Sequence, residues 1–292
     1  MLMIGDLPAL LGQRIRFQPY GRPTDDCAAI AGWGLKGVAL KAKADADRYG
    51  LPYLALEDGF LRSISLGDTD PPRSVVVDDI GIYYNAQAPS RLERLIAAPH
   101  EQTEIERAQA VVRSWRCDRL SKYNHAREQT RACAAHVLVV DQTAGDASIT
   151  YGLADEQSFR QMLEAALDEH PSLDVIVKVH PDVIAGRKRA HFDALTVGQS
   201  KRVMLLATDT HPPGLLEHAE AVYVVTSQMG FEALMWGKPV HTFGMPFYAG
   251  WGLTKDELQA PERRRTSHRV SLDDLVHAAL VEYPSYIDPE TL

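Results

Sequence analysis

The sequence predicts an α/β protein built from two doubly wound, Rossmann-like domains. Short apolar runs rich in β-branched residues each stop at a polar cluster, which is typical of strands buried on both faces of a parallel sheet. At 292 residues, the chain has the length of two ordinary domains. Open parallel sheets bind ligands just beyond the carboxyl ends of their strands, so we expect the site there. The runs are residues 54–56, 75–77, 137–140, 175–179 and 222–225.

In the first half, helical and extended patterns alternate. Strands are expected at 15–18 and 27–31, a helix at 35–49 and a further strand ending at Glu57. Such alternation implies crossover connections and a parallel sheet. Ser90 and Glu93 then form a capping box that opens a helix ending before Pro99, and a second helix covers 102–116.

A new series of strands and helices begins at His136, so we place the domain boundary near 125–135 and divide the chain into domains 1–130 and 131–292. Ser271 and Asp274 cap a terminal helix after residue 270. Two such domains facing each other across a cleft form the GT-B arrangement of many glycosyltransferases, although fold analogy alone assigns no function. The elements expected after the boundary are strands at 136–141, 174–179, 202–206, 221–225 and 238–243, and helices at 155–169 and 228–236.

The charge and hydropathy of the chain exclude some classes of function. A net charge of -8 offers no basic face for nucleic acid. No apolar run approaches the ~20 residues of a membrane helix, and the N-terminus lacks the pattern of a signal peptide, so we expect a cytoplasmic protein. The basic run 263–265 is either a solvated loop or a contact with anionic lipid or glycolipid phosphate, which would place the protein peripherally at the inner face of the cytoplasmic membrane.

Glu57 and Asp58 stand together at the end of a buried strand, before Gly59. Adjacent carboxylates repel each other, which raises the proton affinity of one and suits it to acid/base chemistry. A plain turn is the alternative.

His180 follows a strand that contains Lys178, and Pro181 holds His180 in extended geometry. A histidine beside a lysine suits binding of an anion such as phosphate, although a structural histidine explains the pattern equally well.

The sequence 226–232 joins a strand to a helix. The hydroxyls of Thr226 and Ser227 at a helix N-terminus suit a phosphate, with plain N-capping as the alternative. Glu232, one turn further on, either reaches a ribose or lies on a solvated helix surface.

The first strand-to-helix connection of the second half, residues 141–146, carries Asp141, Gln142, Gly145 and Asp146. A carboxylate at this position could attack a sugar carbon or protonate a leaving group. Capping of the next helix is the alternative.

Six segments together resemble the KpsC-type capsule polysaccharide proteins, a family of retaining β-Kdo glycosyltransferases that use CMP-β-Kdo to build the linker between a lipid anchor and a bacterial capsule. The resemblance spans about residues 30–290. The segments are Leu-Glu-Asp-Gly-Phe-Leu-Arg-Ser at 56–63, Val-Val-Asp-Asp-Ile-Gly-Ile-Tyr-Tyr at 76–84, Leu-Ser-Lys-Tyr-Asn at 120–124, Val-Val-Asp-Gln-Thr at 139–143, Lys-Val-His-Pro-Asp at 178–182 and Tyr-Ala-Gly-Trp-Gly-Leu-Thr at 248–254.

The resemblance implies an enzyme that works without a bound metal and needs no cofactor besides its donor substrate, CMP-β-Kdo. It implies that Asp146 is the nucleophile of a double displacement and that Glu57 or Asp58 handles the acceptor proton. Arg62 and Lys122 are matched to the carboxylate of Kdo or to the acceptor. The residues matched to the donor are Gln142, Lys178, His180, Pro181, Thr226, Ser227, Gln228 and Glu232.

The implied partners are CMP-Kdo, a Kdo-bearing phosphatidylglycerol-type glycolipid acceptor and other capsule assembly proteins at the inner membrane. Many proteins of this type carry two transferase modules, whereas this chain has room for one. Two alternatives stay open: an enzyme that uses another CMP-ulosonic acid, as sialyltransferases do, and a non-catalytic component of capsule export.

Overall fold

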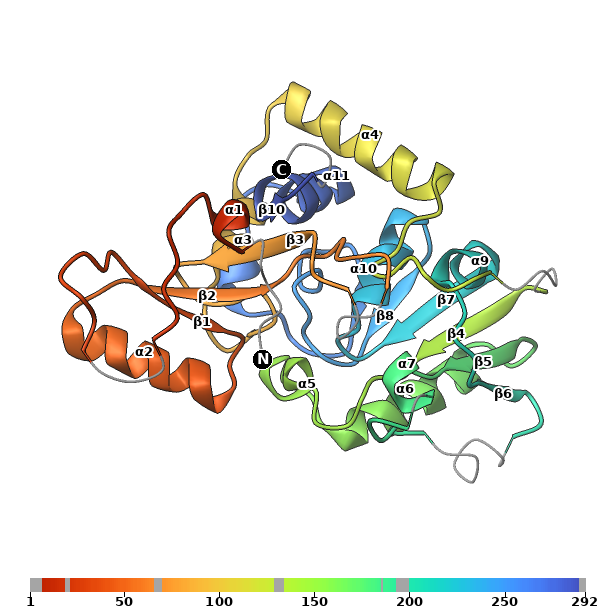
Figure 1. Cartoon of the computed structure of the whole chain (residues 1–292). Helices are drawn as coiled ribbons and strands as arrows, with labels where there is room; N and C mark the ends of the chain where they lie inside the picture. Colours follow the sequence, from red (N-terminus) through yellow and green to blue (C-terminus); the bar gives the residue numbers. More distant parts are fainter. Residues whose placement is uncertain are drawn as a thin grey trace.

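The computed structural model describes residues 7–18, 22–65, 70–128, 134–184, 186–192 and 200–288. Within these ranges the strands form two sheets, one of four strands and one of six (Figure 1). The structure is therefore mixed α/β, as the sequence predicts. No described helix is long and apolar enough to cross a bilayer.

The six-stranded sheet of the second half is parallel throughout, in the order β6-β5-β4-β7-β8-β9. This is the 3-2-1-4-5-6 order of dinucleotide-binding folds, and it confirms the doubly wound prediction here. The strands are β4 (His136–Val140), β5 (Asp174–Lys178), β6 (Val203–Leu206), β7 (Ala219–Val224), β8 (Val240–Thr242) and β9 (Lys255–Asp256).

Helices cover both faces of this sheet because alternate strand residues point to opposite sides. Val137 and Val139 pack in one core with Phe159 of α6 (Glu156–Glu169). Leu138 and Val140 pack in the other, with α9 (Pro212–His218) and α10 (Gln228–Met235). Two short helices, α5 (Ala147–Tyr151) and α7 (Pro181–Ile184), follow β4 and β5.

The sheet of the first half corrects the prediction of a second parallel, doubly wound domain. Its order is β1-β2-β3-β10, and β1 (Ile30–Trp33) is parallel to β2 (Tyr53–Asp58) across helix α2 (Gly37–Tyr49). β3 (Ser74–Asp78) is antiparallel to β2 and to β10 (Pro284–Tyr286). A parallel return needs a crossover, usually a helix, and the described part of the connection 59–73 has none.

The N-terminal residues also differ from the prediction. Residues 15–18 form no strand, and the strand expected at 27–31 starts at Ile30. A short helix, α1 (Leu7–Leu11), instead packs Leu7 and Leu10 against the first sheet. Both predicted helices after the sheet are present, as α3 (Arg91–Ala97), which has the expected capping box, and α4 (Gln102–Cys117).

The end of the chain returns to the first half. The predicted terminal helix is α11 (Leu272–Val276), continued by a π-helix, η2 (His277–Glu282). Its buried residues share a core with Leu92 and Ile96 of α3, and β10 then joins the first sheet; Figure 1 shows α4, α11 and β10 together at the top of the view. The assignment of all of 131–292 to one domain is thus corrected for this last segment. The boundary predicted between residues 130 and 131 lies outside the described ranges, which leave out residues 129–133, and stays a prediction.

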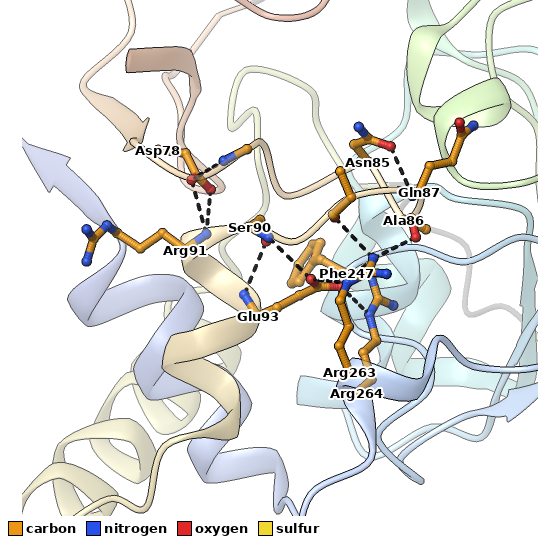
Figure 2. A network of polar contacts seen from close by, with 12 residues as sticks. Asp78, Asn85, Ala86, Gln87, Ser90, Arg91, Glu93, Phe247, Arg263 and Arg264 are labelled. Atoms are coloured by element: carbon orange, nitrogen blue, oxygen red, sulfur yellow. Dashed lines mark hydrogen bonds and ion pairs between the residues drawn. The ribbon is translucent and has the colours of Figure 1, made fainter. Parts of the chain in front are cut away.

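Ion pairs join the two halves, and they overturn both interpretations of the basic run 263–265 for Arg264, which is buried, whereas Arg263 is paired but exposed. Glu93 accepts from Arg264 Nε at 2.7 Å and from Arg263 Nε at 2.8 Å (Figure 2). The side chain of Arg264, in the 3-10 turn η1 (Glu262–Arg264), is 0% exposed and also donates to the carbonyls of Pro246 and Ala249. Arginine reaches this depth because its planar fork matches one carboxylate and several carbonyls at once.

Candidate active site

The end of β2 carries two carboxylates in different environments. Trp33 Nε1 donates to Glu57 Oε1 at 2.9 Å. Burial is the main cause that raises the pKa of Glu57, and the charge of Asp58 adds to it. Glu57 is therefore a carboxylate with increased basicity, which suits it to take a proton.

Asp58 instead forms an ion pair within the protein. Arg62 Nε donates to Asp58 Oδ2 at 2.7 Å, and Arg62 Nη1 donates to Ser63 Oγ and to the carbonyl of Asp70, each at 2.9 Å. The side chain of Arg62 is buried. The structure thus places the guanidinium on an internal carboxylate, and its predicted contact with a sugar carboxylate stays a prediction.

The segment 121–124 brings Lys122 to these carboxylates. The Arg62 amide donates to the Lys122 carbonyl at 3.1 Å, and the Asn124 amide donates to the Ile64 carbonyl at 2.8 Å. Burial disfavours the charge on Lys122, but Tyr123 and the carboxylates of Asp58, Glu57 and Asp146 outweigh it and raise its pKa. A lysine that stays charged amid carboxylates from both halves is suited to bind an anionic substrate.

Glu232 of α10 accepts hydrogen bonds from the segment that carries Lys122. It is 1% exposed, so a solvated helix surface is excluded. Its oxygens accept from Ser121 Oγ at 2.8 Å and from the Lys122 amide at 3.3 Å. Burial raises its pKa to about 7. The ribose contact implied for Glu232 stays a prediction, whereas its contact with the lysine segment is a feature that the sequence did not indicate.

Asp146 lies at the start of α5, where its Oδ1 accepts from the Ser148 amide at 2.9 Å. It therefore caps a helix, which was the alternative, and the cap also fixes one carboxylate oxygen. Gly145 precedes it at φ +81°, a conformation that favours glycine. The charge of Asp146 acts on both Lys122 and His180, which places it near residues from three separate loops.

Gln142 is buried and links the segment around Asp146 to Thr226, which follows β7. Its Oε1 accepts from the Thr226 amide at 2.9 Å, and its Nε2 donates to Thr226 Oγ1 at 3.0 Å and to Ser148 Oγ at 3.3 Å. The side-chain amide of Gln142 thus fixes Thr226 relative to Ser148, the residue whose backbone amide bonds to Asp146.

One ring nitrogen of His180 bonds to the backbone. Its Nδ1 accepts from the Asp182 amide at 3.1 Å, so a neutral ring carries its proton on Nε2 and can donate it to a phosphate. Burial lowers the pKa of His180, and burial also lowers that of Lys178 at the end of β5. Pro181 is the first residue of α7, a position that suits proline.

The start of α10 faces the first half. Ser227 caps this helix, since its Oγ accepts from the Met229 amide at 3.3 Å, as the capping alternative expects. Gln228 Nε2 donates to the Phe60 carbonyl at 2.7 Å, so this predicted donor residue also contacts the segment after Glu57.

Several residues of the site were not predicted from the sequence. Trp33 donates a hydrogen bond to Glu57, Ser121 Oγ donates to Glu232, and the Ser148 amide donates to Asp146. Tyr83 and Tyr84 have pKa values raised first by burial and then by the charge of Glu57, which places both near it. A tryptophan between two glycines is the local signal that could have identified Trp33; the others depend on contacts between distant segments.

The fold and the site define a mixed α/β protein with one doubly wound parallel sheet, whose titratable side chains meet at strand ends. The chain belongs to the capsule polysaccharide biosynthesis protein family, whose model matches residues 28–135 and 107–286. It is 45% identical over 282 residues to the capsule polysaccharide modification protein LipA of Neisseria meningitidis serogroup B, covering 91% of this chain and 39% of LipA. It is 37% identical to the lipopolysaccharide-processing protein LpsZ of Rhizobium meliloti, covering 88% of this chain and 59% of LpsZ.

Two solved structures of Thermosulfurimonas dismutans KpsC are similar to this chain. The β-Kdo 2,4 transferase matches with a TM-score of 0.90 and 44% identity, covering 98% of this chain and 88% of that one. The β-Kdo 2,7 transferase matches with a TM-score of 0.64 and 31% identity, covering 89% and 78%. The chain thus spans well under half of the LipA relative, but most of each solved transferase.

Proposed function

We propose that this chain is a retaining glycosyltransferase that moves β-Kdo from CMP-β-Kdo to a Kdo-terminated glycolipid in capsule linker synthesis. The observation that carries the proposal is that the charges of Glu57, Asp58 and Asp146 all act on Lys122, in a chain 44% identical to a β-Kdo 2,4 transferase over nearly its whole length. The higher similarity to the 2,4 than to the 2,7 enzyme favours a 2,4 linkage.

In the proposed arrangement the two sheets face each other across a GT-B-like cleft, and the donor binds to the parallel sheet. His180 Nε2–H, Thr226 and Ser227 contact the phosphate of CMP, and Lys122 pairs with an anionic group of the donor. These donors and charges stabilise the negative charge that develops on the leaving phosphate. Gln142 acts through Thr226 and not on the sugar.

Two successive displacements at the anomeric carbon then account for retention of the β configuration. Asp146 attacks the anomeric carbon, the bond to the phosphate oxygen breaks, and CMP leaves with the electron pair. An acceptor hydroxyl next gives its proton to Glu57 and attacks the same carbon, so the bond to Asp146 breaks and its carboxylate is restored. We assign the base to Glu57 because one oxygen of Asp58 is occupied by the hydrogen bond from Arg62, whereas burial raises the pKa of Glu57.

The acceptor is the Kdo-bearing phosphatidylglycerol-type glycolipid, met at the inner face of the cytoplasmic membrane together with other capsule assembly proteins. These partners rest on the family resemblance.

The test is release of CMP from CMP-Kdo, with CMP-sialic acid assayed in parallel. Asp146→Ala should abolish transfer while CMP still binds. Asp155→Ala is the matched control, because Asp155 is likewise a helix N-cap, accepting from the Gln157 and Ser158 amides. Each variant should lose about 1 kcal/mol of stability from its cap, but only Asp146→Ala should lose turnover.

Intact mass spectrometry of Glu57→Gln with CMP-Kdo should trap the sugar adduct on Asp146. An adduct on another residue would refute the nucleophile. Turnover that is faster with CMP-sialic acid than with CMP-Kdo would refute CMP-Kdo as the donor. Unchanged function of Asp146→Ala would favour the alternative of a non-catalytic component of capsule export.

A further inference from the structure

A cluster of ligand side chains lies away from the proposed transfer site. His100, between α3 and α4, faces His277 of η2, with ring centroids 4.9 Å apart. One ligand atom from each of His100, His277 and Glu282 lies within 4.8 Å of the others. Tetrahedral zinc ligands with bonds of about 2.0–2.1 Å lie about 3.3 Å apart, so small side-chain movements would close the site.

The hydrogen bond between His100 and Asp274 fixes the tautomer of His100 that can bind a metal. Its side chain is 3% exposed, and its Nδ1 is 3.1 Å from Asp274 Oδ1. A carboxylate accepts, so Nδ1 carries the proton and Nε2 offers a lone pair. Among the described residues this buried Nε2 has no hydrogen-bond partner. A carboxylate that orients a histidine in this way is the usual second partner of a metal ligand.

The π-helix brings the other two ligands to one face. His277 Nε2 is 3.9 Å from Glu282 Oε2 and 3.6 Å from Glu104 Oε1 of α4. Five residues apart in a regular α-helix, His277 and Glu282 would be about 140° apart around the axis. The i→i+5 pattern of a π-helix brings them closer to one face, and such turns are frequent at functional sites.

We propose that Zn²⁺ binds between His100, His277 and Glu282, with Glu104 as the fourth ligand. Two imidazoles with carboxylates suit zinc better than magnesium or calcium, which prefer all-oxygen sites. Asp274 is a positioning residue for His100. The metal is structural, since it ties the segment between α3 and α4 to the C-terminal helix, and it takes no part in sugar transfer.

The experiment uses the full chain, stripped with EDTA and titrated with zinc chloride alone. We expect one zinc per chain by elemental analysis after desalting, a higher melting temperature, and the visible absorption of tetrahedral cobalt when Co²⁺ replaces zinc. His277→Ala should abolish binding, and Asp274→Asn should weaken it about 10- to 100-fold. The control is His268→Ala, which removes an exposed histidine outside the cluster.

His100→Gln keeps a polar side chain of similar reach and guards against loss of folding, which circular dichroism at 25 °C checks. Failure of the wild type to retain zinc would overturn the proposal. Equal zinc affinity of the wild type and folded His100→Gln would overturn it as well.

Discussion

The buried carboxylate of Glu232 should make the stability of this protein depend on pH near neutrality. The folded protein raises its pKa from the ordinary 4.5 to about 7, chiefly because the group is buried. Each pKa unit corresponds to 1.36 kcal/mol, so the difference is worth about 3 kcal/mol. Because the folded pKa lies above the unfolded one, this contribution is fully present below pH 4.5 and is lost as pH rises through 7.

The substitution Glu232→Gln removes the titration and keeps the shape. An amide in the same orientation still accepts from the Lys122 amide through its oxygen, and its nitrogen can donate to Ser121 Oγ. The free energy of unfolding of the wild type should therefore fall by about 2–3 kcal/mol relative to Glu232→Gln between pH 5 and pH 8.

Urea denaturation at pH 5, 6, 7 and 8 measures this difference. Glu164→Gln, on the exposed face of α6, is the matched control and should follow the wild type at every pH. If the curves of wild type and Glu232→Gln run parallel across this range, the reasoning about the buried carboxylate is refuted.

Two further changes test buried contacts, the first between the halves and the second within the second half. Glu93→Gln removes the carboxylate that Arg263 and Arg264 share and leaves a buried guanidinium uncompensated, so stability should fall by about 3–5 kcal/mol in denaturant titration. Gly230→Ala would place a Cβ 2.3 Å from the Tyr248 hydroxyl in a well-packed core, so the melting temperature should drop, with a loss of about 1–3 kcal/mol.

The controls use nearby positions without these contacts. Glu262→Gln precedes the two arginines but is exposed, and it should change stability by less than about 0.5 kcal/mol. Gly37→Ala, at the start of α2, has nothing within 4 Å of the added Cβ and should be neutral or stabilising. Equal effects at control and test positions would contradict the assigned contacts.

Local patterns in the sequence were enough to predict the parallel sheet of the second half. Strands β4 to β8 began within one or two residues of their predicted starts, because runs such as 137–140 are apolar on both faces and α6 between them carries its own cap. The two-residue strand β9 was not predicted, because it has no apolar run of its own. The side chains at strand ends were predictable for the same reason. Glu57, His180 and Thr226 could be named as candidates from their neighbours in sequence alone.

The amino-acid sequence by itself determined where most of the strands and helices lie and which polar side chains follow them, since period, capping and turn residues act within a few positions. Only the tertiary structure decided the antiparallel direction of β3, the return of β10 to the first sheet, the carboxylate that receives Arg62, and the burial of Arg264 and Glu232. The physical reason is that desolvation and ion pairing depend on which distant segments meet, and no local pattern encodes that meeting.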